Sequence, residues 1–393
     1  MSRPFSAAFI LVIALFIACS NAPTGKGDGE IGTATRVASN DAGESLSDPV
    51  RFRVETVATG LEVPWSIVFA PDGRILFTER PGRLRVIENG KLRNEPLVTI
   101  NDVALGAESG LMGLALHPQF AQNHLLYLSY TYREGGMRAR VVRYRETGDA
   151  LTERRVIIEN IPAASIHSGV RLHFGPDGKL YITTGDAAER ELAQRLDSLA
   201  GKILRLNDDG SVPPDNPFVN QEGARPEIWS YGHRNPEGFD WQPATNLMFD
   251  TDHGPSGFDG PGGGDEVNIV ERGKNYGWPA IHHQQTQEGM ESPLLEYTPS
   301  VAPASGMFYR GTAFPDFKNN FFFGCLRGKC MIRVVLDGRR VIFQERLLQN
   351  DYGRIRDVAE GPDGAIYFST SNRDGRGSPA QNDDRILRLV PVK

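Results

Sequence analysis

The stretch "FGPDGKLYITTGD" (residues 174–186) joins a tight turn to an apolar strand. Pro176 presets φ for a turn, the following Asp-Gly completes the turn, and "LYITT" is rich in residue types that favour β-strands. The same module returns as "FAPDGRILFTE" from Phe69 and as "EGPDGAIYFST" from Glu360. Three weaker copies begin at Leu116, Trp241 and Phe314. One β-unit is therefore predicted to occur six times.

Six units of this length are what a six-bladed β-propeller requires. The turn prolines are separated by 47, 58, 67, 72 and 47 residues, and they are Pro71, Pro118, Pro176, Pro243, Pro315 and Pro362. A propeller arranges such units as four-stranded antiparallel blades around an axis. A β-sandwich with irregular loops would leave the sixfold count unexplained. The sequence therefore predicts an all-β, six-bladed β-propeller over residues 51–393.

The ends of this domain and one of its loops carry further predictions. "RFRVETV" from Arg51 and "DRILRLV" from Asp384 are expected to share a blade, which closes the ring and leaves no open edge. "AERELAQRLDSL" (residues 188–199) would place Leu192, Leu196 and Leu199 on one helix face, so we expect a helix between blades. The uneven spacing of the turns predicts long loops on one face, where the functional site is expected.

The N-terminal segment predicts export. Arg3 precedes the apolar run "FSAAFILVIALFIA", which is too short to span a bilayer comfortably and ends at Cys19. Residues 1–19 are interpreted as a signal peptide with a lipobox-like end; a cleaved secretory signal without lipid is the alternative. Residues 20–50 are rich in Gly, Ser, Asn and Asp, which predicts a flexible linker. The protein is expected in the periplasm or at the cell surface, lipid-anchored to a membrane through Cys19.

Charge and motif content exclude several function classes. The net charge of −6 argues against a nucleic-acid partner. The 43 glycines and 26 prolines indicate many turns and argue against long helices. There is no HExxH motif, no GxSxG elbow and no dinucleotide-binding fingerprint in a βαβ setting. Zinc-dependent hydrolysis, serine hydrolysis and NAD chemistry therefore have little support.

The repeat does not explain His167 and Asp186, which bracket its third copy at a spacing of nineteen residues. In a blade, this spacing lets a histidine before one strand lie near an aspartate at the end of the next strand. The carboxylate would fix the imidazole tautomer and stabilise the imidazolium, as in a general base. A purely structural His–Asp pair is the alternative.

Three other segments are denser in polar groups than a blade requires. "YGHRNPEG" presents Arg234 and Asn235, donors that suit a carboxylate or an oxyanion. In "YGRIRDV", Arg354 and Arg356 alternate with Ile355, so both arginines point to one side of a strand and require an anion. The Gly-rich loop "DHGPSGFDGPGGGDEVN" offers carboxylates and backbone carbonyls, which are calcium ligands. A solvated flexible loop is the alternative there.

Two cysteines flank a four-residue turn in "GCLRGKC". Cys325 and Cys330 would face each other across a hairpin. An exported protein meets an oxidising compartment, so we expect a disulfide, and two unpaired buried thiols are the alternative.

Several motifs in order resemble those of one family. They are "VPWSIVFAPDG", "SGLMGLALHP", "HSGVRLHFGPDG", "LAGKILRLNDDG", "YGHRNPEGFDW" and "RIRDVAEGPDG". Together they resemble the soluble quinoprotein sugar dehydrogenases, specifically the aldose sugar dehydrogenase branch that uses pyrroloquinoline quinone (PQQ). The resemblance covers nearly all of residues 55–392. It implies a six-bladed propeller that binds PQQ in a basic cleft and oxidises the C1 hydroxyl of aldose sugars to lactones. Electrons would pass to an external quinone or cytochrome.

The resemblance also implies catalytic roles. His167 would remove the proton of the C1 hydroxyl, and Asp186 would hold His167 in place. Hydride from C1 would pass to the C5 carbonyl carbon of PQQ, and Arg234 would stabilise the charge that builds on the quinone.

Cofactor contacts follow from the same resemblance. Arg234 and Asn235 match a cofactor-contacting pair, and Arg354 and Arg356 match the pair that faces the PQQ carboxylates. Arg327 stands where the family often has lysine and is also placed against the cofactor. Glu108 stands where the family usually has glutamine, and an acid there would sit awkwardly near an anionic quinone unless it were paired.

Calcium is implied at two places. Gly254 and Pro255 match backbone-carbonyl ligands of the cofactor's calcium, which would act as a Lewis acid. Glu266 and Tyr276 match positions that are associated with calcium in the aldose branch. Nine residues separate Pro255 from Asp265, more than in many relatives, so this loop is reshaped.

Two other functions remain open from the sequence. A calcium-dependent propeller lactonase or hydrolase would need several side-chain acids and an asparagine at the central channel, whereas arginines dominate the motifs. A non-catalytic, sugar-binding propeller would not need the intact set of His167, Asp186 and Arg234.

Overall fold

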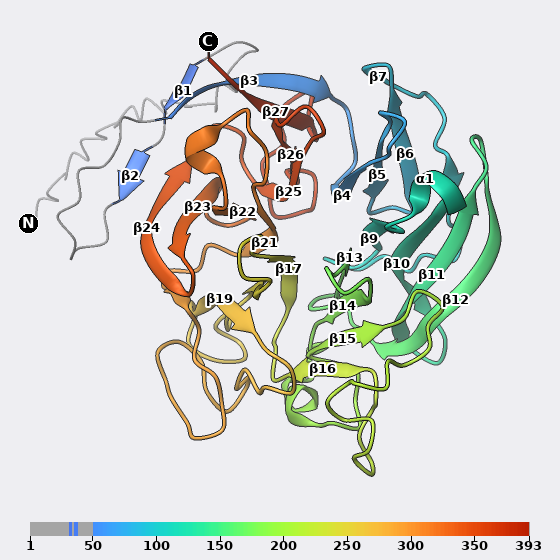
Figure 1. The fold of residues 1–393 in the computed structure, drawn as a ribbon, viewed down its shortest axis with the longest axis vertical. Coiled ribbons are helices and arrows are strands. Elements are labelled where there is room, and N and C mark those ends of the chain that lie inside the picture. Colours follow the sequence, from blue (N-terminus) through green and yellow to red (C-terminus); the bar gives the residue numbers. More distant parts are fainter. Residues whose placement is uncertain (1–30, 34, 38–49, 393) are drawn as a thin grey trace, which may run out of the picture.

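The computed structural model describes residues 31–33, 35–37 and 50–392. Six antiparallel sheets stand around a central axis as blades (Figure 1), and each sheet contributes one strand to the inner ring. The predicted all-β, six-bladed propeller is confirmed. The predicted signal peptide with Cys19 and most of the predicted linker lie outside the described residues.

Each blade runs from an inner strand at the axis to an outer strand at the rim. The first three blades consist of β4 (Pro64–Phe69), β5 (Ile75–Glu79), β6 (Arg83–Glu88), β7 (Lys91–Leu92) and β8 (Val98–Thr99); of β9 (Leu111–Leu116), β10 (Leu125–Arg133), β11 (Met137–Glu146) and β12 (Leu151–Pro162); and of β13 (Gly169–Phe174), β14 (Leu180–Thr184), β15 (Lys202–Leu206) and β16 (Ile228–Tyr231). The last three consist of β17 (Pro236–Trp241), β18 (Met248–Asp252), β19 (Asp265–Val270) and β20 (Leu295–Tyr297); of β21 (Pro303–Phe308), β22 (Phe321–Cys325), β23 (Cys330–Asp337) and β24 (Arg340–Leu347); and of β25 (Ile355–Glu360), β26 (Ile366–Thr370), β27 (Ile386–Pro391) and β3 (Arg51–Ala58).

The Pro-Asp-Gly turns join the inner strand of a blade to its second strand. In the third blade the N–H of Gly178 donates to the carbonyl of Gly175 at 2.9 Å, and Asp177 accepts the N–H of Lys179 at 3.1 Å. Gly178 has φ of +71°, a conformation that costs glycine little. The turn is therefore stabilised by its own residues, because proline sets φ, aspartate caps a backbone donor and glycine reverses the chain.

The two ends of the domain close the ring as predicted. β3 pairs antiparallel with β27, and Val54 lies opposite Leu389. Two short strands that precede the domain pair with outer strands: β1 (Ile31–Thr33) with β3, and β2 (Thr35–Val37) with β24. Buried apolar side chains fill the spaces between neighbouring blades, so each blade is held by its neighbours.

The predicted helix over residues 188–199 is wrong in extent. The structure has only a 3₁₀ turn, η1 (Arg190–Gln194). The buried Lys202 donates from Nζ to the carbonyls of Leu192, Ala193 and Ala200 at 2.9, 2.9 and 2.5 Å. The carbonyl of Leu192 also accepts the N–H of Arg195 at 3.1 Å, and the carbonyl of Ala193 accepts the N–H of Gly232 at 3.0 Å. Contacts with β15 and with the loop before β17 therefore override the local leucine pattern.

The cysteine hairpin forms with its predicted four-residue turn, and Cys325 pairs with Cys330 across β22 and β23. Both thiols are buried and free, so the expected disulfide is absent and the alternative holds. Directly opposed residues in a regular ladder have Cβ atoms about 4.5–5.5 Å apart, whereas a disulfide requires about 3.8 Å. The ladder keeps the two sulfurs as neighbouring thiols.

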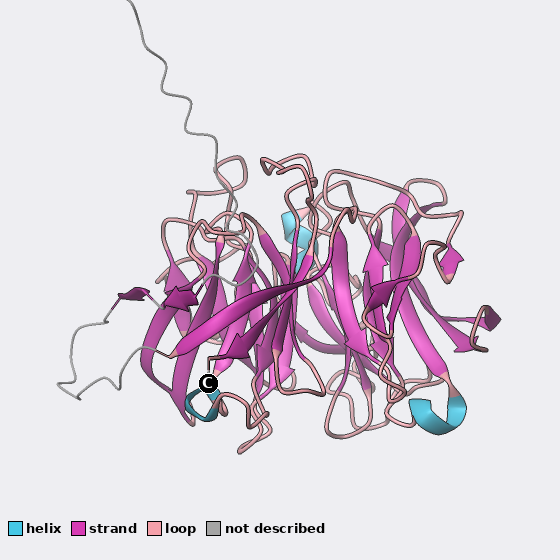
Figure 2. Cartoon of the chain, turned by 90° about the horizontal axis from the view of Figure 1, so that it is seen from above, coloured by secondary structure: helices cyan, strands magenta, loops and turns pink. Residues whose placement is uncertain are grey.

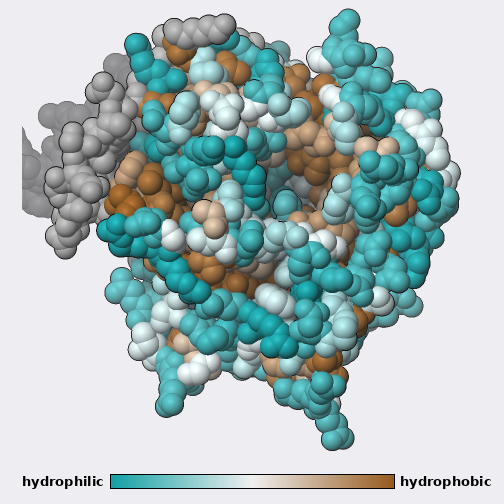
Figure 3. Space-filling view, viewed as in Figure 1, coloured by the Kyte–Doolittle hydropathy of each residue, from teal (hydrophilic) through white to brown (hydrophobic). Residues whose placement is uncertain are grey.

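Loops cover both faces of the disc when the molecule is seen edge-on (Figure 2). One face carries the turns between inner and second strands, together with the short helical turns α1 (Phe120–Asn123) and η2 (Pro315–Phe317). On the face viewed in Figure 1, hydrophilic residues dominate the rim and hydrophobic residues gather around a central hollow (Figure 3). No helix among the described residues has the length and apolar character needed to cross a membrane.

The opposite face carries two classes of loop at each blade. One class leads into the inner strand, and the other leaves the second strand. Because neighbouring blades bring both classes to the axis, residues that are far apart in the sequence converge there. His167, Arg234 and Arg354 belong to the first class, and Arg327 and Asp374 belong to the second.

Candidate active site

A cavity of about 430 Å³ opens on this face at the axis. Its wall contains six arginines, which are Arg80, Arg234, Arg327, Arg354, Arg356 and Arg376. Four carboxylates also line it, and these are Glu108, Glu237, Asp265 and Asp374. Of the residues singled out from the sequence, seven line the cavity: Glu108, His167, Arg234, Gly254, Arg327, Arg354 and Arg356. The cavity is therefore basic and polar, and it suits a small anionic molecule.

The two arginines on β25 and the loop before it are held by buried acids. Arg354 donates from Nε to Asp374 at 2.8 Å, and Arg356 donates from Nη1 to Glu237 at 2.9 Å. Burial and Arg356 lower the pKa of Arg354, although Asp374 opposes this shift. Burial raises the pKa of Asp374, but Arg354 and Arg356 outweigh it, and the pKa lies below its ordinary value. These pairs fix both guanidinium groups at the cavity wall.

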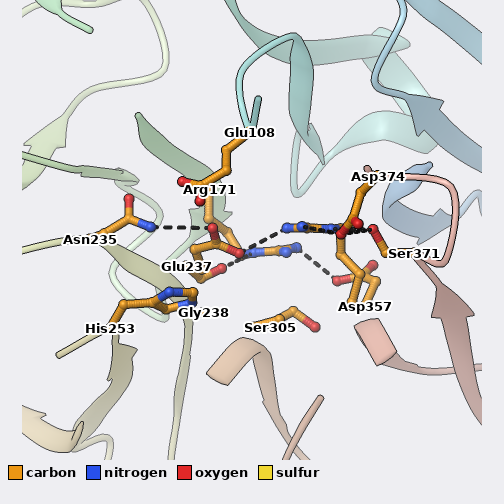
Figure 4. A network of polar contacts seen from close by, with 12 residues as sticks. Glu108, Arg171, Asn235, Glu237, Gly238, His253, Ser305, Asp357, Ser371 and Asp374 are labelled. Carbon is orange, nitrogen blue, oxygen red and sulfur yellow. Dashed lines mark hydrogen bonds and ion pairs between the residues drawn. The ribbon is translucent and has the colours of Figure 1, made fainter. Parts of the chain in front are cut away.

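Asn235 lies just behind this wall. It is 1% exposed, and its amide donates to Glu237 at 3.3 Å and accepts the N–H of Gly169 at 3.1 Å. Figure 4 shows Asn235, Glu237 and Asp374 converging on one network around the axis. Asn235 thus ties the loop before β17 to the start of β13.

His167 and Asp186 form the predicted pair. Nδ1 of His167 lies 2.8 Å from Oδ1 of Asp186, and both residues are buried. Asp186 is fixed in turn, since its Oδ2 accepts the indole N–H of Trp278 at 2.9 Å and its Oδ1 accepts the N–H of Ala188 at 2.8 Å. Among the described residues, Nε2 of His167 has no hydrogen-bond partner, and the ring lines the cavity. This geometry leaves one ring nitrogen available for a proton.

Glu108 is paired with Arg376, so the acid expected to sit awkwardly beside an anionic cofactor has a counter-charge. Its Oε1 binds Arg376 at 2.5 Å, and its Oε2 accepts the backbone N–H of His167 at 3.0 Å. Burial raises the pKa of Glu108, but Arg376 and the His167 N–H outweigh burial, and the pKa is lowered overall. The acid therefore stays ionised and positions the backbone of His167.

The reshaped loop between Pro255 and Asp265 bends over the cavity. Arg234 donates from Nε to Asp259 at 2.8 Å and from Nη2 to Ser256 at 3.2 Å. Phe258 is 67% exposed, and its ring stacks near the ring of His167 with centroids 6.1 Å apart. Phe258 also borders a second hollow, of about 600 Å³, beside η1. The loop thus touches both Arg234 and His167.

The backbone groups proposed for calcium lie at the base of this loop. Gly254 lines the cavity and donates its N–H to Asp265 at 2.9 Å. The carbonyl of Pro255 accepts the N–H of Gly263 at 3.2 Å, which leaves it a second lone pair. Arg327, in the turn after β22, is exposed and lines the same cavity.

Glu266 and Tyr276 do not line the cavity. Glu266 accepts the amide of Asn268 at 3.1 Å, and the hydroxyl of Tyr276 donates to the carbonyl of Ile269 at 2.7 Å and accepts the N–H of Glu271 at 2.8 Å. The phenol is therefore engaged by backbone groups. Both residues lie near a separate buried cluster around His233.

That cluster holds His233, Asp250 and Asp252. Nδ1 of His233 lies 3.4 Å from Asp250 and 3.3 Å from Asp252. Burial raises the pKa of Asp250 to about 7; His233 opposes this shift and Asp252 adds to it. Burial, with Asp252 as a further cause, also raises the pKa of Glu266.

Several cavity residues were not singled out from the sequence. They are Arg80, Glu237, His253, Phe258, Asp374 and Arg376, and to these is added Asp259, which lines the second hollow and binds Arg234. Most of them lie in loops that leave second strands or lead into inner strands, so alignment of the six repeats by their turn prolines would have drawn attention to them. Their partners come from other blades, and no local pattern marks those pairings.

The comparisons with known proteins agree with the fold and the cavity. Residues 61–387 match the family described as "Glucose / Sorbosone dehydrogenase". The chain is 37% identical over 347 residues to the aldose sugar dehydrogenase YliI of Escherichia coli; the match covers 83% of this chain and 92% of that protein. It is 30% identical over 271 residues to quinoprotein glucose dehydrogenase B of Acinetobacter calcoaceticus, and this match covers 61% of this chain and 54% of that protein.

Solved structures give the same result. The PQQ-bound aldose sugar dehydrogenase of Streptomyces coelicolor is 32% identical and superposes with a TM-score of 0.76, covering 88% of this chain and 99% of that chain. The apo form of the E. coli soluble aldose sugar dehydrogenase is 34% identical with a TM-score of 0.79, covering 87% and 100%. The resemblance inferred from the motifs is confirmed, and the hydrolase and the non-catalytic propeller are not favoured. The chain belongs to the glucose/sorbosone dehydrogenase family and is an oxidoreductase of the aldose sugar dehydrogenase type.

Proposed function

We propose that this protein oxidises the C1 hydroxyl of aldose sugars to lactones, with PQQ bound in the cavity as the oxidant and calcium beside it. The carrying observation is a single cavity that joins a histidine with a free Nε2, held by an aspartate, to six arginines. Quinoproteins among the relatives support the identity of the cofactor.

The residues present fit the cofactor. PQQ is a planar tricarboxylate, and Arg327, Arg354 and Arg356 offer guanidinium groups to carboxylates on one side of the cavity. Arg234 would also contact the cofactor, and Asn235 would hold the loop of Arg234 in place. Leu326 and Ala302 offer apolar wall for a flat ring system. When bound, PQQ would supply a two-electron acceptor that no amino-acid side chain provides.

A calcium ion fits the base of the loop after β18. The carbonyls of Gly254 and Pro255 are hard oxygen donors at the cavity edge, and Asp265 adds negative charge nearby. The ion would polarise a neighbouring carbonyl as a Lewis acid.

His167 is the group that moves a proton. Asp186 accepts the Nδ1–H of the ring, which fixes the tautomer with a lone pair on Nε2. Nε2 can then take the proton of a sugar hydroxyl, and Asp186 stabilises the imidazolium that forms. Because Trp278 and Ala188 hold Asp186, this orientation is kept while the ring changes charge. Glu108 fixes the backbone of His167 from the other side.

We also propose an exported enzyme that passes its electrons to an external quinone or cytochrome. The support is the N-terminal segment, with Cys19 as a candidate lipid anchor. Labelling with a radioactive fatty acid in wild type and in Cys19→Ser tests the anchor. A label that persists in the variant would exclude lipidation at Cys19.

Reconstitution tests the proposed function. Protein produced without PQQ is expected to be inactive and to reduce an artificial dye after PQQ and Ca²⁺ are added with an aldose. PQQ alone, Ca²⁺ alone and a non-reducing sugar are the controls. Turnover that survives exhaustive chelation and shows no quinone absorbance would overturn the proposal.

A further inference from the structure

Strands β18 and β19 place four polar side chains on one side of the fourth blade, away from the cavity. Asp250 lies opposite Asn268, and Asp252 lies opposite Glu266. Directly paired residues, and residues two apart in a strand, share a face of the sheet. The four side chains therefore form a compact square, and His233 approaches it from the loop before β17.

Most of this square is buried, and it holds three carboxyl groups beside a single histidine. Asp250 is 0% exposed and Asp252 is 3% exposed. Within the described residues, no lysine or arginine side chain forms a hydrogen bond or ion pair with Asp250, Asp252 or Glu266. Burial of an ionised carboxylate without a counter-charge is costly, so such groups are normally paired or bound to a metal.

Unused acceptors point into the same space. In the part of the chain that the structure describes, neither carboxylate oxygen of Asp250 has a hydrogen-bond partner, and Oδ1 of Asn268 has none either. Asn268 is an uncharged residue that is 1% exposed, and its Nδ2 donates to Glu266 at 3.1 Å. Buried polar atoms are almost always satisfied in native proteins, and orphaned acceptors from two strands at one place indicate a missing donor or cation.

His233 alone does not satisfy these groups. Its Nε2 lies 2.9 Å from the hydroxyl of Ser230, and its ring stacks on Tyr276 with centroids 4.7 Å apart. Its Nδ1 is shared between two carboxylates at 3.3 and 3.4 Å, which are long distances for a charge-assisted hydrogen bond. A protonated His233 would also leave Asp250 with an unused oxygen.

We propose that Nδ1 of His233 and the carboxylates of Asp250 and Asp252 bind a divalent metal ion, with Oδ1 of Asn268 and the carboxylate of Glu266 at its edge. The candidate ligand atoms of the first three residues lie within 4.8 Å of one another. One imidazole with carboxylates is a ligand set suited to Mn²⁺ or Zn²⁺, whereas Ca²⁺ prefers oxygen ligands alone. This site differs from the implied pairing of Glu266 with Tyr276, whose hydroxyl is bound to backbone groups.

The ion would brace the active-site loop without touching substrate. Asp252 accepts the N–H of Arg234 at 3.2 Å and the N–H of Asn235 at 2.7 Å. The carbonyl of Arg234 accepts the N–H of Asp186 at 2.8 Å. A metal on Asp252 therefore fixes the peptide that presents Arg234 to the cavity and meets Asp186. These are positioning roles, and they do not depend on which cofactor the cavity binds.

Metal content of the full chain, produced without PQQ, tests the site. Wild-type protein dialysed against buffer with Mn²⁺ or Zn²⁺ is expected to retain one ion per chain that Asp250→Asn does not retain. Asp240→Asn is the matched control, because Asp240 is a buried acid of the same blade that is already paired with Arg310 at 2.7 Å. This control is expected to keep the ion. Equal metal content in wild type and Asp250→Asn would overturn the proposal.

Thermal unfolding gives a second readout, and its chelation experiment uses wild-type protein alone. Chelation is expected to lower the melting temperature of wild type by about 5 °C or more, and added Mn²⁺ or Zn²⁺ is expected to restore it. The sign for Asp250→Asn is equally informative. If an ion is present, loss of this ligand lowers the melting temperature. If the cluster is empty, neutralising an unpaired buried carboxylate raises the melting temperature, and that result would exclude the metal.

Discussion

Two histidine–aspartate pairs lie in neighbouring blades and share a spacing but not an environment. His167 precedes Asp186 by nineteen residues, and His233 precedes Asp252 by nineteen residues. Nδ1 lies 2.8 Å from the carboxylate in the first pair and 3.3 Å in the second. His167 lines the cavity, whereas His233 is 0% exposed inside the fourth blade. Equal spacing therefore does not imply equal function.

The difference lies in register. His167 stands two residues before β13, but His233 stands three residues before β17. Successive side chains of a chain entering a strand point to opposite sides, so a shift of one residue moves a side chain from the cavity to the interior. Arg234, two residues before β17, takes the cavity-facing position. One pair thus serves the proposed chemistry, and the other forms the proposed metal site.

Replacing each histidine with alanine should show that the two pairs have different functions. His167→Ala is expected to lower kcat by about 10²–10⁴-fold with PQQ binding nearly intact, because a general base acts mainly in the transition state. His233→Ala is expected to lower the melting temperature and to keep kcat within about tenfold, since His233 does not reach the cavity. Steady-state kinetics with saturating PQQ, beside thermal unfolding, checks both. Equal losses of kcat would show that register does not decide the roles.

Asp186→Asn should have a smaller effect than loss of the histidine. The amide can still accept from Trp278, but it no longer stabilises the imidazolium or enforces the same tautomer. We expect kcat to fall by about 10–100-fold and the pH–rate profile to move, because the partner charge on the imidazole is lost. Asp252→Asn is the comparison variant, and its pH–rate profile should keep the wild-type position. An unchanged profile in Asp186→Asn would contradict the role of Asp186.

The blades could be predicted because the information that forms them is local. Each Pro-Asp-Gly turn contains its own bends and its own cap, as Asp177 and Gly178 show. The pair His167–Asp186 was found for a similar reason, since both residues flank one hairpin. The buried state of Asp250 could not be found in this way. In "MFDTD" three polar residues follow two apolar ones, a pattern typical of a strand that runs out into solvent, yet all five residues are buried in the structure.

Loop contacts were missed for a related physical reason. Asp259 reaches Arg234 from a glycine-rich segment, and Arg376 reaches Glu108 across 268 residues. Such pairings depend on how the ring closes, and no periodic pattern marks them. The same limit applies to the helix expected over residues 188–199. There contacts of this segment with Lys202 and Gly232, from other parts of the third blade, override a leucine pattern that is correct only as a local preference.

Asp259→Ala should release the side chain of Arg234, the residue that follows His233, and leave both histidine–aspartate pairs intact. Asp259 holds the guanidinium of Arg234 and adds negative charge at the cavity edge. Its removal frees Arg234 for an anionic cofactor, so we expect the Kd for PQQ to fall by about three- to tenfold. Titration followed by quinone absorbance measures this, and Phe258→Ala is the control because it changes the same loop without a charge. Weaker PQQ binding in Asp259→Ala would mean that Asp259 positions Arg234 and does not compete for it.

Glu108→Gln should give the smallest effect. It tests the hydrogen bond from the backbone N–H of His167 to Glu108, which supports the first histidine–aspartate pair. Glu108 accepts the N–H of His167 and binds Arg376, and its pKa is lowered from the ordinary value of 4.5. A carboxyl with a lowered pKa contributes stability above its unfolded pKa and loses it as pH falls through the folded value. Arg376 is half exposed, so solvent screens the pair, and glutamine keeps one acceptor. We expect the free energy of unfolding of wild type to exceed that of the variant by about 1 kcal/mol near pH 7. This difference should shrink below about pH 4.5. Urea unfolding at several pH values measures it, with Glu153→Gln as an exposed control. A difference that stays constant down to pH 3 would show that packing, and not the charge of Glu108, supports His167.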